Sequence, residues 1–112
     1  MTNLNHEIIG SALILKPSRR IDSSSAKGFE DDANALVEAG PKLVVVDASD
    51  LDYISSAGLR VILTTAKKAK SAGGGLTIAC AKNNVKEVLA VSGFDNIFGL
   101  HDSVAQAISS LA

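Results

Sequence analysis

Two adjacent serines, Ser55 and Ser56, stand where the hydrophobic pattern of the chain changes its period. The residues from Leu43 to Val46 form an unbroken apolar run, which is typical of a strand covered on both faces. From Ser56 onward the apolar residues recur three or four apart, as on one face of a helix: Leu59, Ile62, Leu63 and Ala66. The pattern therefore predicts a strand, a polar loop from Asp47 to Ser55, and two hydroxyls where a helix begins.

Hydroxyls at the start of a helix have a specific chemical setting. The first backbone N–H groups of a helix have no partner within it, and the aligned peptide dipoles leave about half a positive charge there. Such a position stabilises an anion. A phosphate on a serine of the first turn would add roughly −1.5 to −2 charge at pH 7. The serine pair is therefore a candidate for a reversible charge switch, and the simpler alternative is that both serines only cap the helix.

A catalytic serine would need a base beside it, and the sequence offers few candidates. The histidines, His6 and His101, both lie near the ends of the chain, and no Gly-x-Ser-x-Gly motif is present. Three carboxylates precede the serines, at Asp47, Asp50 and Asp52, but their spacing is not that of a calcium loop. Aspartates after a strand often bond to turn backbone instead. We therefore expect neither an enzyme nor a metal or cofactor site, and interpret the serine site as a target of modification.

Length and composition indicate one globular domain that spans residues 1–112. Hydrophobic residues make up 46% of the chain and charged residues 21%, and the net charge of −1 gives no overall field that would attract nucleic acid or acidic lipid. A solvated helix face explains the basic cluster of Lys67, Lys68 and Lys70. Because Cys80 is the only cysteine, no intrachain disulfide can form. Cys80 is expected to be a small buried residue.

Two further sequence signals are missing from the chain. The first ten residues lack the basic start and the apolar run of an export signal, and no run of about 18 apolar residues occurs, so we expect a cytoplasmic protein with no membrane partner. Gly73 to Gly75 form a glycine-rich loop, but it follows a predicted helix and no Gly-Lys-Ser/Thr comes after it. Nucleotide binding by this loop is therefore not expected.

Strands and helices are expected to alternate along the chain. An N-terminal hairpin or bulged strand is predicted over residues 4–9 and 11–16, interrupted at Gly10. Further strands are predicted over residues 42–47, over 76–80, and around Phe94, Ile97 and Phe98. Four helices are predicted. The first follows Ser23 to Ser25, the second runs from Ser56 to Ser71, and the last starts at Asp102 or Ser103. The third is capped by Asn83 or Asn84 and has Val85, Val88, Leu89 and Val91 on its apolar side.

This alternation favours a compact α/β domain of four or five mostly parallel strands and four helices, with the N-terminal strand or hairpin at the edge. Ligands in such folds gather at the carboxyl ends of the strands. The connection from Asp47 to Ser56 is expected at such an end.

The segment VVVDASDLDYISSAGLRVIL resembles the signature of the STAS domain family, most closely that of its stand-alone bacterial anti-sigma factor antagonists. In this family the signature is a hydrophobic strand that ends in aspartate, then a short loop, then a hydroxyl residue two places before Gly-Leu at the start of a helix. Here the matching residues are Val44 to Asp47, Ser56, and Gly58 with Leu59. The resemblance extends to a turn before the first helix, a glycine-then-strand passage and a third helix with the strand after it: Arg20 to Asp22, Gly73 to Ile78, and Val88 to Phe98.

The resemblance implies a partner-switching regulator of sigma factor activity. In such systems the unmodified antagonist binds an anti-sigma factor that is also a serine kinase of the histidine-kinase-like ATPase class. The kinase phosphorylates the antagonist and weakens the complex, and a PP2C-type phosphatase reverses the modification. By position Ser56 is the implied phosphoacceptor. Ser55 stands where many members have aspartate and Ala57 where many have a second serine, so Ser55 is the alternative acceptor.

The surface expected to contact the partner surrounds this serine. It comprises Asp22, Asp47, Asp52, Tyr53, Ile54, Ser55, Ala57, Gly58, Leu59 and Arg60. Other hypotheses keep the fold but change the role: partner switching that controls secretion or biofilm formation, or a STAS subunit of a lipid-transport complex whose serine is never phosphorylated. An enzyme of small-molecule metabolism is the least favoured alternative, because it requires an additional base near Ser56.

Overall fold

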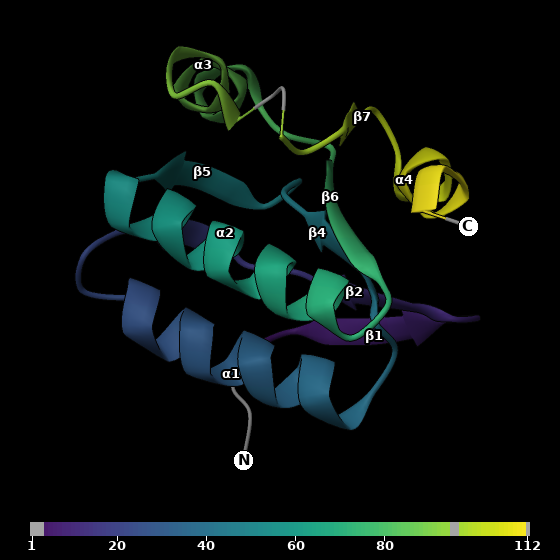
Figure 1. Ribbon diagram of the computed structural model, residues 1–112. Helices are drawn as coiled ribbons and strands as arrows, with labels where there is room; N and C mark the ends of the chain where they lie inside the picture. Colours follow the sequence, from purple (N-terminus) through teal and green to yellow (C-terminus); the bar gives the residue numbers. More distant parts are fainter. Residues whose placement is uncertain (1–3, 95–96, 112) are drawn as a thin grey trace.

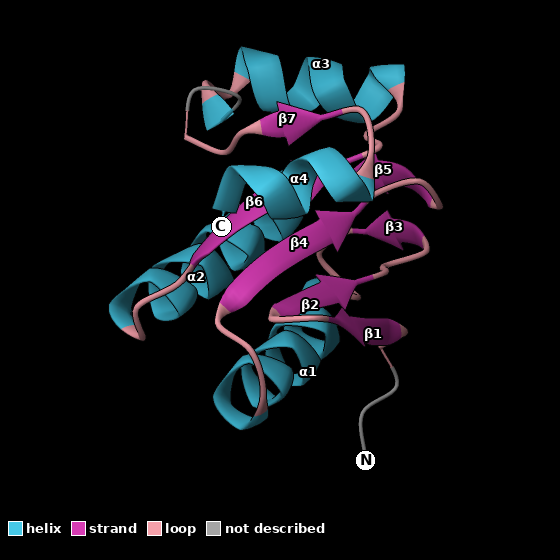
Figure 2. Cartoon of the chain, turned by 90° about the vertical axis from the view of Figure 1, so that its right-hand side faces the viewer, coloured by secondary structure: helices cyan, strands magenta, loops and turns pink. Residues whose placement is uncertain are grey.

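A mostly parallel sheet forms the centre of the molecule in the computed structural model, which describes residues 4–94 and 97–111. Five strands pair in the order β1-β2-β4-β6-β7 (Figure 2). Only the first pair is antiparallel, and the strands are β1 (His6–Ile9), β2 (Ala12–Leu15), β4 (Leu43–Asp47), β6 (Gly75–Ala79) and β7 (Leu100–His101). The predicted α/β class and the N-terminal hairpin at the sheet edge are confirmed.

Helices cover both faces of this sheet. α1 (Ala26–Ala39) and α2 (Ser56–Ser71) lie side by side on one face, and α4 (Val104–Leu111) packs on the other (Figures 1 and 2). Alternate strand residues serve the two layers: Leu13 and Leu15 belong to the larger core, whereas Ile14 belongs to the smaller core that contains Ala107 of α4. α3 (Asn83–Val91) lies apart from these layers and packs against β5 (Leu51–Ile54).

The loop predicted between Asp47 and Ser55 contains a strand, so this part of the interpretation is wrong. β5 pairs in parallel with β3 (Arg19–Ile21), and the two form a separate two-stranded sheet. The segment predicted as a turn before the first helix is thus a strand up to Ile21. Local periodicity could not reveal this pairing, because it joins segments about thirty residues apart and β5 shows a buried residue only at each end.

The third helix differs from the sequence prediction at both of its ends. Lys82 occupies the N-cap position without a side-chain capping bond, and Asn84 instead donates a hydrogen bond to the backbone carbonyl of Asp52. Val85 and Leu89 face the core as predicted, but Val91 is 89% exposed. The buried side of α3 therefore ends at Leu89, two residues earlier than the pattern suggests.

The last strand is also shifted along the chain. β7 is Leu100–His101, while Phe98 is buried in the larger core and packs edge-to-face on Phe94 with ring centroids 5.7 Å apart. The stretch Val88 to Phe98 includes residues 95–96, which lie outside the described residues. The start of the last helix is as predicted, because the Ser103 hydroxyl accepts a hydrogen bond from the Gln106 N–H at 3.2 Å.

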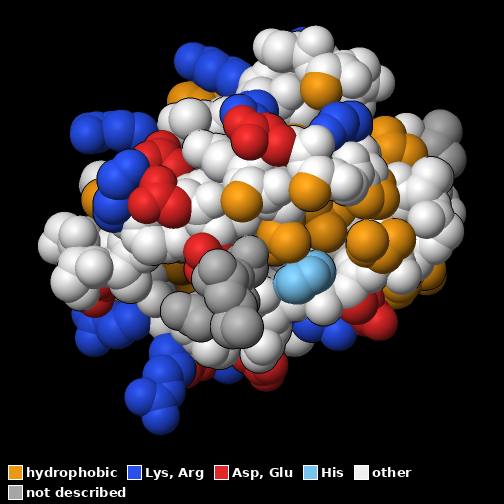
Figure 3. All heavy atoms as spheres, turned by 90° about the horizontal axis from the view of Figure 1, so that it is seen from below, with side chains coloured by type: hydrophobic (Ala, Val, Ile, Leu, Met, Phe, Trp, Pro, Cys, Tyr) orange, Lys and Arg blue, Asp and Glu red, His pale blue; other side chains and the backbone are white. Residues whose placement is uncertain are grey.

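The distribution of surface charge and the character of the helices both bear on function. Basic and acidic side chains are interspersed on the face seen in Figure 3, without a large field of one sign. Among the helices of the described residues, none combines the length and the apolar character needed to cross a membrane.

Candidate functional site

The two serines occupy different positions at the start of α2. Ser55 is the N-cap: its hydroxyl accepts a hydrogen bond from the Gly58 N–H at 3.2 Å, and its own N–H donates to the Ile21 carbonyl at 2.9 Å. Ser56 is the first helical residue and is exposed. Within residues 4–94 and 97–111, no hydrogen bond engages its hydroxyl. The capping role and the free hydroxyl are therefore divided between the two residues.

Gly58 allows the first turn of α2 to lie directly against the small sheet. A Cβ atom at this position would stand 2.7 Å from the backbone oxygen of Ile21 and 2.8 Å from Cγ1 of Ile54. Both distances are shorter than atoms tolerate, so only glycine fits without a shift of the helix or of β3. The start of α2, and with it Ser56, is positioned by this close packing.

Three of the predicted partner-contact residues are not on the surface. Ile54 is 2% exposed, Leu59 is 4% exposed, and Gly58 is buried. Their apolar contacts belong to the larger core or to the packing of α2 on β3 and β5. The expectation that these three residues face a partner is wrong, because they are buried in the packing beneath the start of α2.

Two exposed residues, Arg20 and Tyr53, and the half-buried Asp22 contact one another beside the helix start. The Arg20 guanidinium lies 5.0 Å from the centre of the Tyr53 ring, and its Nε is 2.7 Å from Oδ2 of Asp22. Asp22 also accepts hydrogen bonds from the hydroxyl and N–H of Ser24 and from the N–H of Ser25. The bond from the Ser24 hydroxyl is the main cause that lowers the pKa of Asp22 to about 2, with help from Arg20. Sequence reasoning missed Arg20 because its contact with Tyr53 depends on the β3–β5 pairing.

Asp52 connects the other side of this surface to α3. Its carboxylate is 2.5 Å from the Lys82 ammonium, and its carbonyl accepts the Asn84 bond described above. Asp47 is half-buried and accepts a hydrogen bond from the Ser49 N–H at 3.1 Å, as expected for an aspartate after a strand. In the described part of the chain, no three His, Cys, Asp or Glu side chains converge on a point that could hold a metal.

Two further predicted contact residues, Ala57 and Arg60, lie in the first turns of α2, which begins at Ser56. Arg60 is exposed one turn further along α2, and Ala57 is half-buried. Cys80 is half-buried instead of buried, at the carboxyl end of β6, and burial raises the pKa of its thiol. The candidate site thus comprises the exposed residues Ser56, Arg20, Asp52, Tyr53 and Arg60, together with the half-buried Asp22.

Loss of the Ser55 hydroxyl is expected to weaken the helix start. Ser55→Ala removes the side-chain bond to the Gly58 N–H, and the loss of an N-cap costs about 1 kcal/mol. Urea denaturation should show this decrease in the free energy of unfolding. Ser56→Ala is the matched control and should leave it unchanged within ~0.5 kcal/mol. Equal losses in the two variants would contradict the separate positions of the serines.

The lowered pKa of Asp22 predicts that the stability difference between the wild type and an Asp22→Asn variant depends on pH. Its pKa is lowered from 3.8 to about 2 in the folded state, so its contribution is present above about pH 4 and is lost as the pH falls through about 2. Asp22→Asn should therefore unfold at a lower temperature than the wild type at neutral pH, and the gap should close between about pH 4 and pH 2. Melting curves from neutral pH down to about pH 2 test the prediction, and a gap that does not narrow over this range would contradict it.

Comparison with known proteins gives this site a family context. The profile of the STAS domain matches residues 3–107. The chain is 42% identical over 83 residues to BtrV of Bordetella bronchiseptica, which is named as an anti-sigma factor antagonist, and the match covers 74% of this chain and 72% of BtrV. A protein of Thermotoga maritima, also named as an anti-sigma factor antagonist, has a solved structure that matches with a TM-score of 0.89 at 23% identity, over 96% of this chain and 93% of that one.

The solved structures of SpoIIAA also have this fold. The unphosphorylated form matches with a TM-score of 0.81 at 13% identity, over 96% of this chain and 94% of that one. The phosphorylated form, from Bacillus, matches with a TM-score of 0.72 at 11% identity, over 96% of this chain and 97% of that one. At these identities the structures show the shared fold alone. Because the family profile spans nearly the whole chain, the protein belongs to the STAS domain family.

Proposed function

We propose that this protein is a cytoplasmic anti-sigma factor antagonist that binds an anti-sigma factor kinase through the surface around Ser56. The observation that carries the proposal is the division of roles at the start of α2: the Ser55 hydroxyl caps the helix, and the Ser56 hydroxyl is exposed and unengaged by the described residues. A kinase can reach such a hydroxyl without unfolding the helix. Ser56 is therefore the proposed phosphoacceptor, and the protein acts by binding instead of by catalysis.

Phosphorylation would change this surface without a large rearrangement. The kinase transfers the γ-phosphoryl group of ATP to the Ser56 oxygen, and ADP and a proton are released. The added dianion lies at the positive end of the helix dipole, so the free protein tolerates it. A partner that covers the site must instead strip water from that dianion. A loss of ~3 kcal/mol would weaken the complex about a hundredfold.

The names of the relatives support this assignment. BtrV is named as an anti-sigma factor antagonist at an identity well above that of the structural matches. SpoIIAA has been solved in a phosphorylated and an unphosphorylated form. The two SpoIIAA forms are what a domain that alternates between two covalent states would give. A PP2C-type phosphatase would return this chain to its binding form by hydrolysing the phosphate on Ser56.

The experiment is a reconstitution with the anti-sigma factor kinase of the same organism. The purified protein should co-elute with the kinase in size-exclusion chromatography without nucleotide triphosphate. Addition of ATP should release it from the kinase in phosphorylated form, and treatment with a PP2C-type phosphatase should restore co-elution. Failure to form any complex with the kinase would contradict the proposed function.

A further inference from the structure

A second candidate site lies at the opposite end of α2 from Ser56. A pocket of about 400 Å³ opens between the second half of α2, the start of β6 and the end of α4. This volume falls in the range of sites that hold small ligands. Most of the side chains that line it are apolar: Leu63, Ala66, Leu76, Ile97, Phe98 and Leu111. Ile97 is 58% exposed, so apolar surface at this pocket remains open to solvent.

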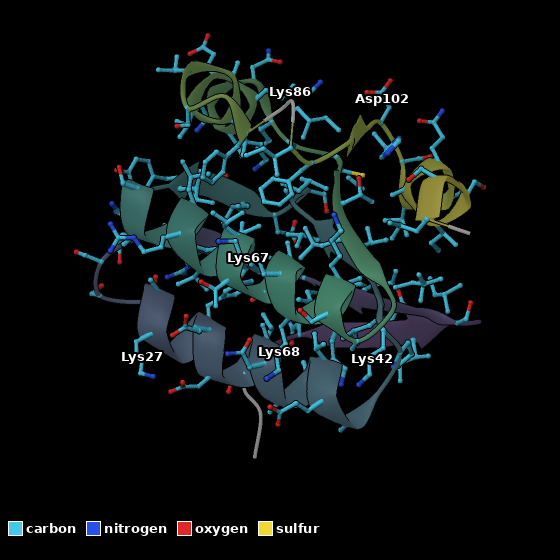
Figure 4. All side chains as sticks on the ribbon, viewed as in Figure 1. Lys27, Lys42, Lys67, Lys68, Lys86 and Asp102 are labelled. Carbon is cyan, nitrogen blue, oxygen red and sulfur yellow. The ribbon has the colours of Figure 1, made fainter. Side chains whose placement is uncertain are left out.

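Two lysines give the pocket a charge. Lys67 and Lys70 also line it, and because they are three residues apart on α2 they project from one face of the helix. Both are exposed, and neither makes an ion pair with the residues that the structure describes. Lys68 differs from them: it lies toward α1 (Figure 4) and pairs with Glu38 at 2.6 Å. The pocket thus combines an apolar hollow with two available cations.

We propose that this pocket binds a small amphiphilic anion, a molecule with an alkyl chain and a carboxylate or phosphate head group. The chain would lie against Leu63, Leu76 and Phe98, and the head group would lie beside Lys67 and Lys70. Hydrophobic burial would supply most of the affinity and the two ammonium groups the preference for an anion. Lys70 stands in the last turn of α2, where it also offsets the negative end of the helix dipole, so Lys67 is the more available partner.

The competing explanation is that the lysine stems merely cover apolar surface while their ammonium groups stay in water. The two explanations differ in how binding depends on head-group charge. An anion site requires that decanoate or decyl phosphate bind more tightly than decyltrimethylammonium, which has the same alkyl chain. A merely apolar surface would bind all three alike.

An NMR titration of the full chain with each of these three compounds, below the concentration at which it forms micelles, distinguishes the explanations. At least one of the two anions should bind saturably and shift the methyl signals of Leu63, Leu76 and Leu111, and decyltrimethylammonium should bind about tenfold more weakly. Whether decanoate or decyl phosphate binds more tightly identifies the head group. Absence of saturable binding by both anions, or equal affinity for the cation, would overturn the proposal.

Charge variants provide the matched controls. The double variant Lys67→Gln/Lys70→Gln should weaken binding of the anion about tenfold and leave that of decyltrimethylammonium unchanged. Lys86→Gln removes one positive charge on α3, away from the pocket, and should bind the anion as the wild type does. Undiminished anion binding by the double variant would overturn the proposal. The proposal does not depend on phosphorylation of Ser56, because that residue does not line the pocket.

Discussion

Protein phosphorylated on Ser56 is expected to bind the anti-sigma factor kinase about a hundredfold more weakly than the unmodified protein. Ser56→Asp, which adds a single negative charge, is expected to lie between the two. The reason is that a charge on an exposed first-turn residue is solvated in the free protein but must lose water or meet carboxylates in the complex. Isothermal titration calorimetry of each form against the kinase, without ATP, measures the differences.

Two controls separate this charge effect from a change in folding. Ser56→Ala should bind the kinase as the unmodified protein does. Ser56→Asp should be at least as stable as the wild type in urea, because an acidic side chain in the first turn complements the helix dipole. If the effect is electrostatic repulsion, part of the lost affinity should return at high salt. Equal affinities of Ser56→Ala and Ser56→Asp would contradict the mechanism.

Gly58→Ala is expected to destabilise the protein by about 1–3 kcal/mol. A new Cβ would lie 2.7 Å from the Ile21 oxygen, and because this atom belongs to the backbone of β3 it cannot rotate away. Either the helix start or the small sheet must move. Urea denaturation followed by circular dichroism should show a lower free energy of unfolding.

Gly28→Ala is the matched control for this prediction. Gly28 lies in α1 and is exposed, and a Cβ there would have no atom within 4 Å. Alanine is the better helix former, so this variant should gain up to about 1 kcal/mol. The two substitutions are chemically identical, and only the contacts differ. A gain in stability from both variants would contradict the close packing of α2 on β3.

Much of the fold could be predicted because its signals are local. The start of α2 follows from the change of hydrophobic period at Ser56 and from Leu59 and Ile62 three residues apart. β5 could not be predicted in the same way, because a four-residue strand with buried residues only at its ends has no clear period. The N-cap of α3 was misplaced for a related reason: Asn84 bonds to Asp52 of a strand distant in sequence instead of to its own helix.

The position of the two serines at the start of a helix could be predicted from the sequence, but their separate roles could not. The sequence indicates a hydroxyl at the start of a helix, but two adjacent serines fit that description equally, and it is the hydrogen bond from the Gly58 N–H that identifies Ser55 as the N-cap. Neither the close approach of Gly58 to Ile21 nor the position of Arg20 over Tyr53 can be inferred without the β3–β5 pairing. Both contacts join segments that are distant in the sequence, and hydrophobic periodicity reports only on local structure.

Mapping of the phosphate by mass spectrometry tests the central proposal most directly. Wild-type protein would be incubated with the kinase and ATP, digested, and compared with Ser56→Ala treated in the same way. The account predicts a single phosphate on the Ser56 hydroxyl and none on the Ser56→Ala protein. Phosphate on Ser55, or none on either serine, would contradict it.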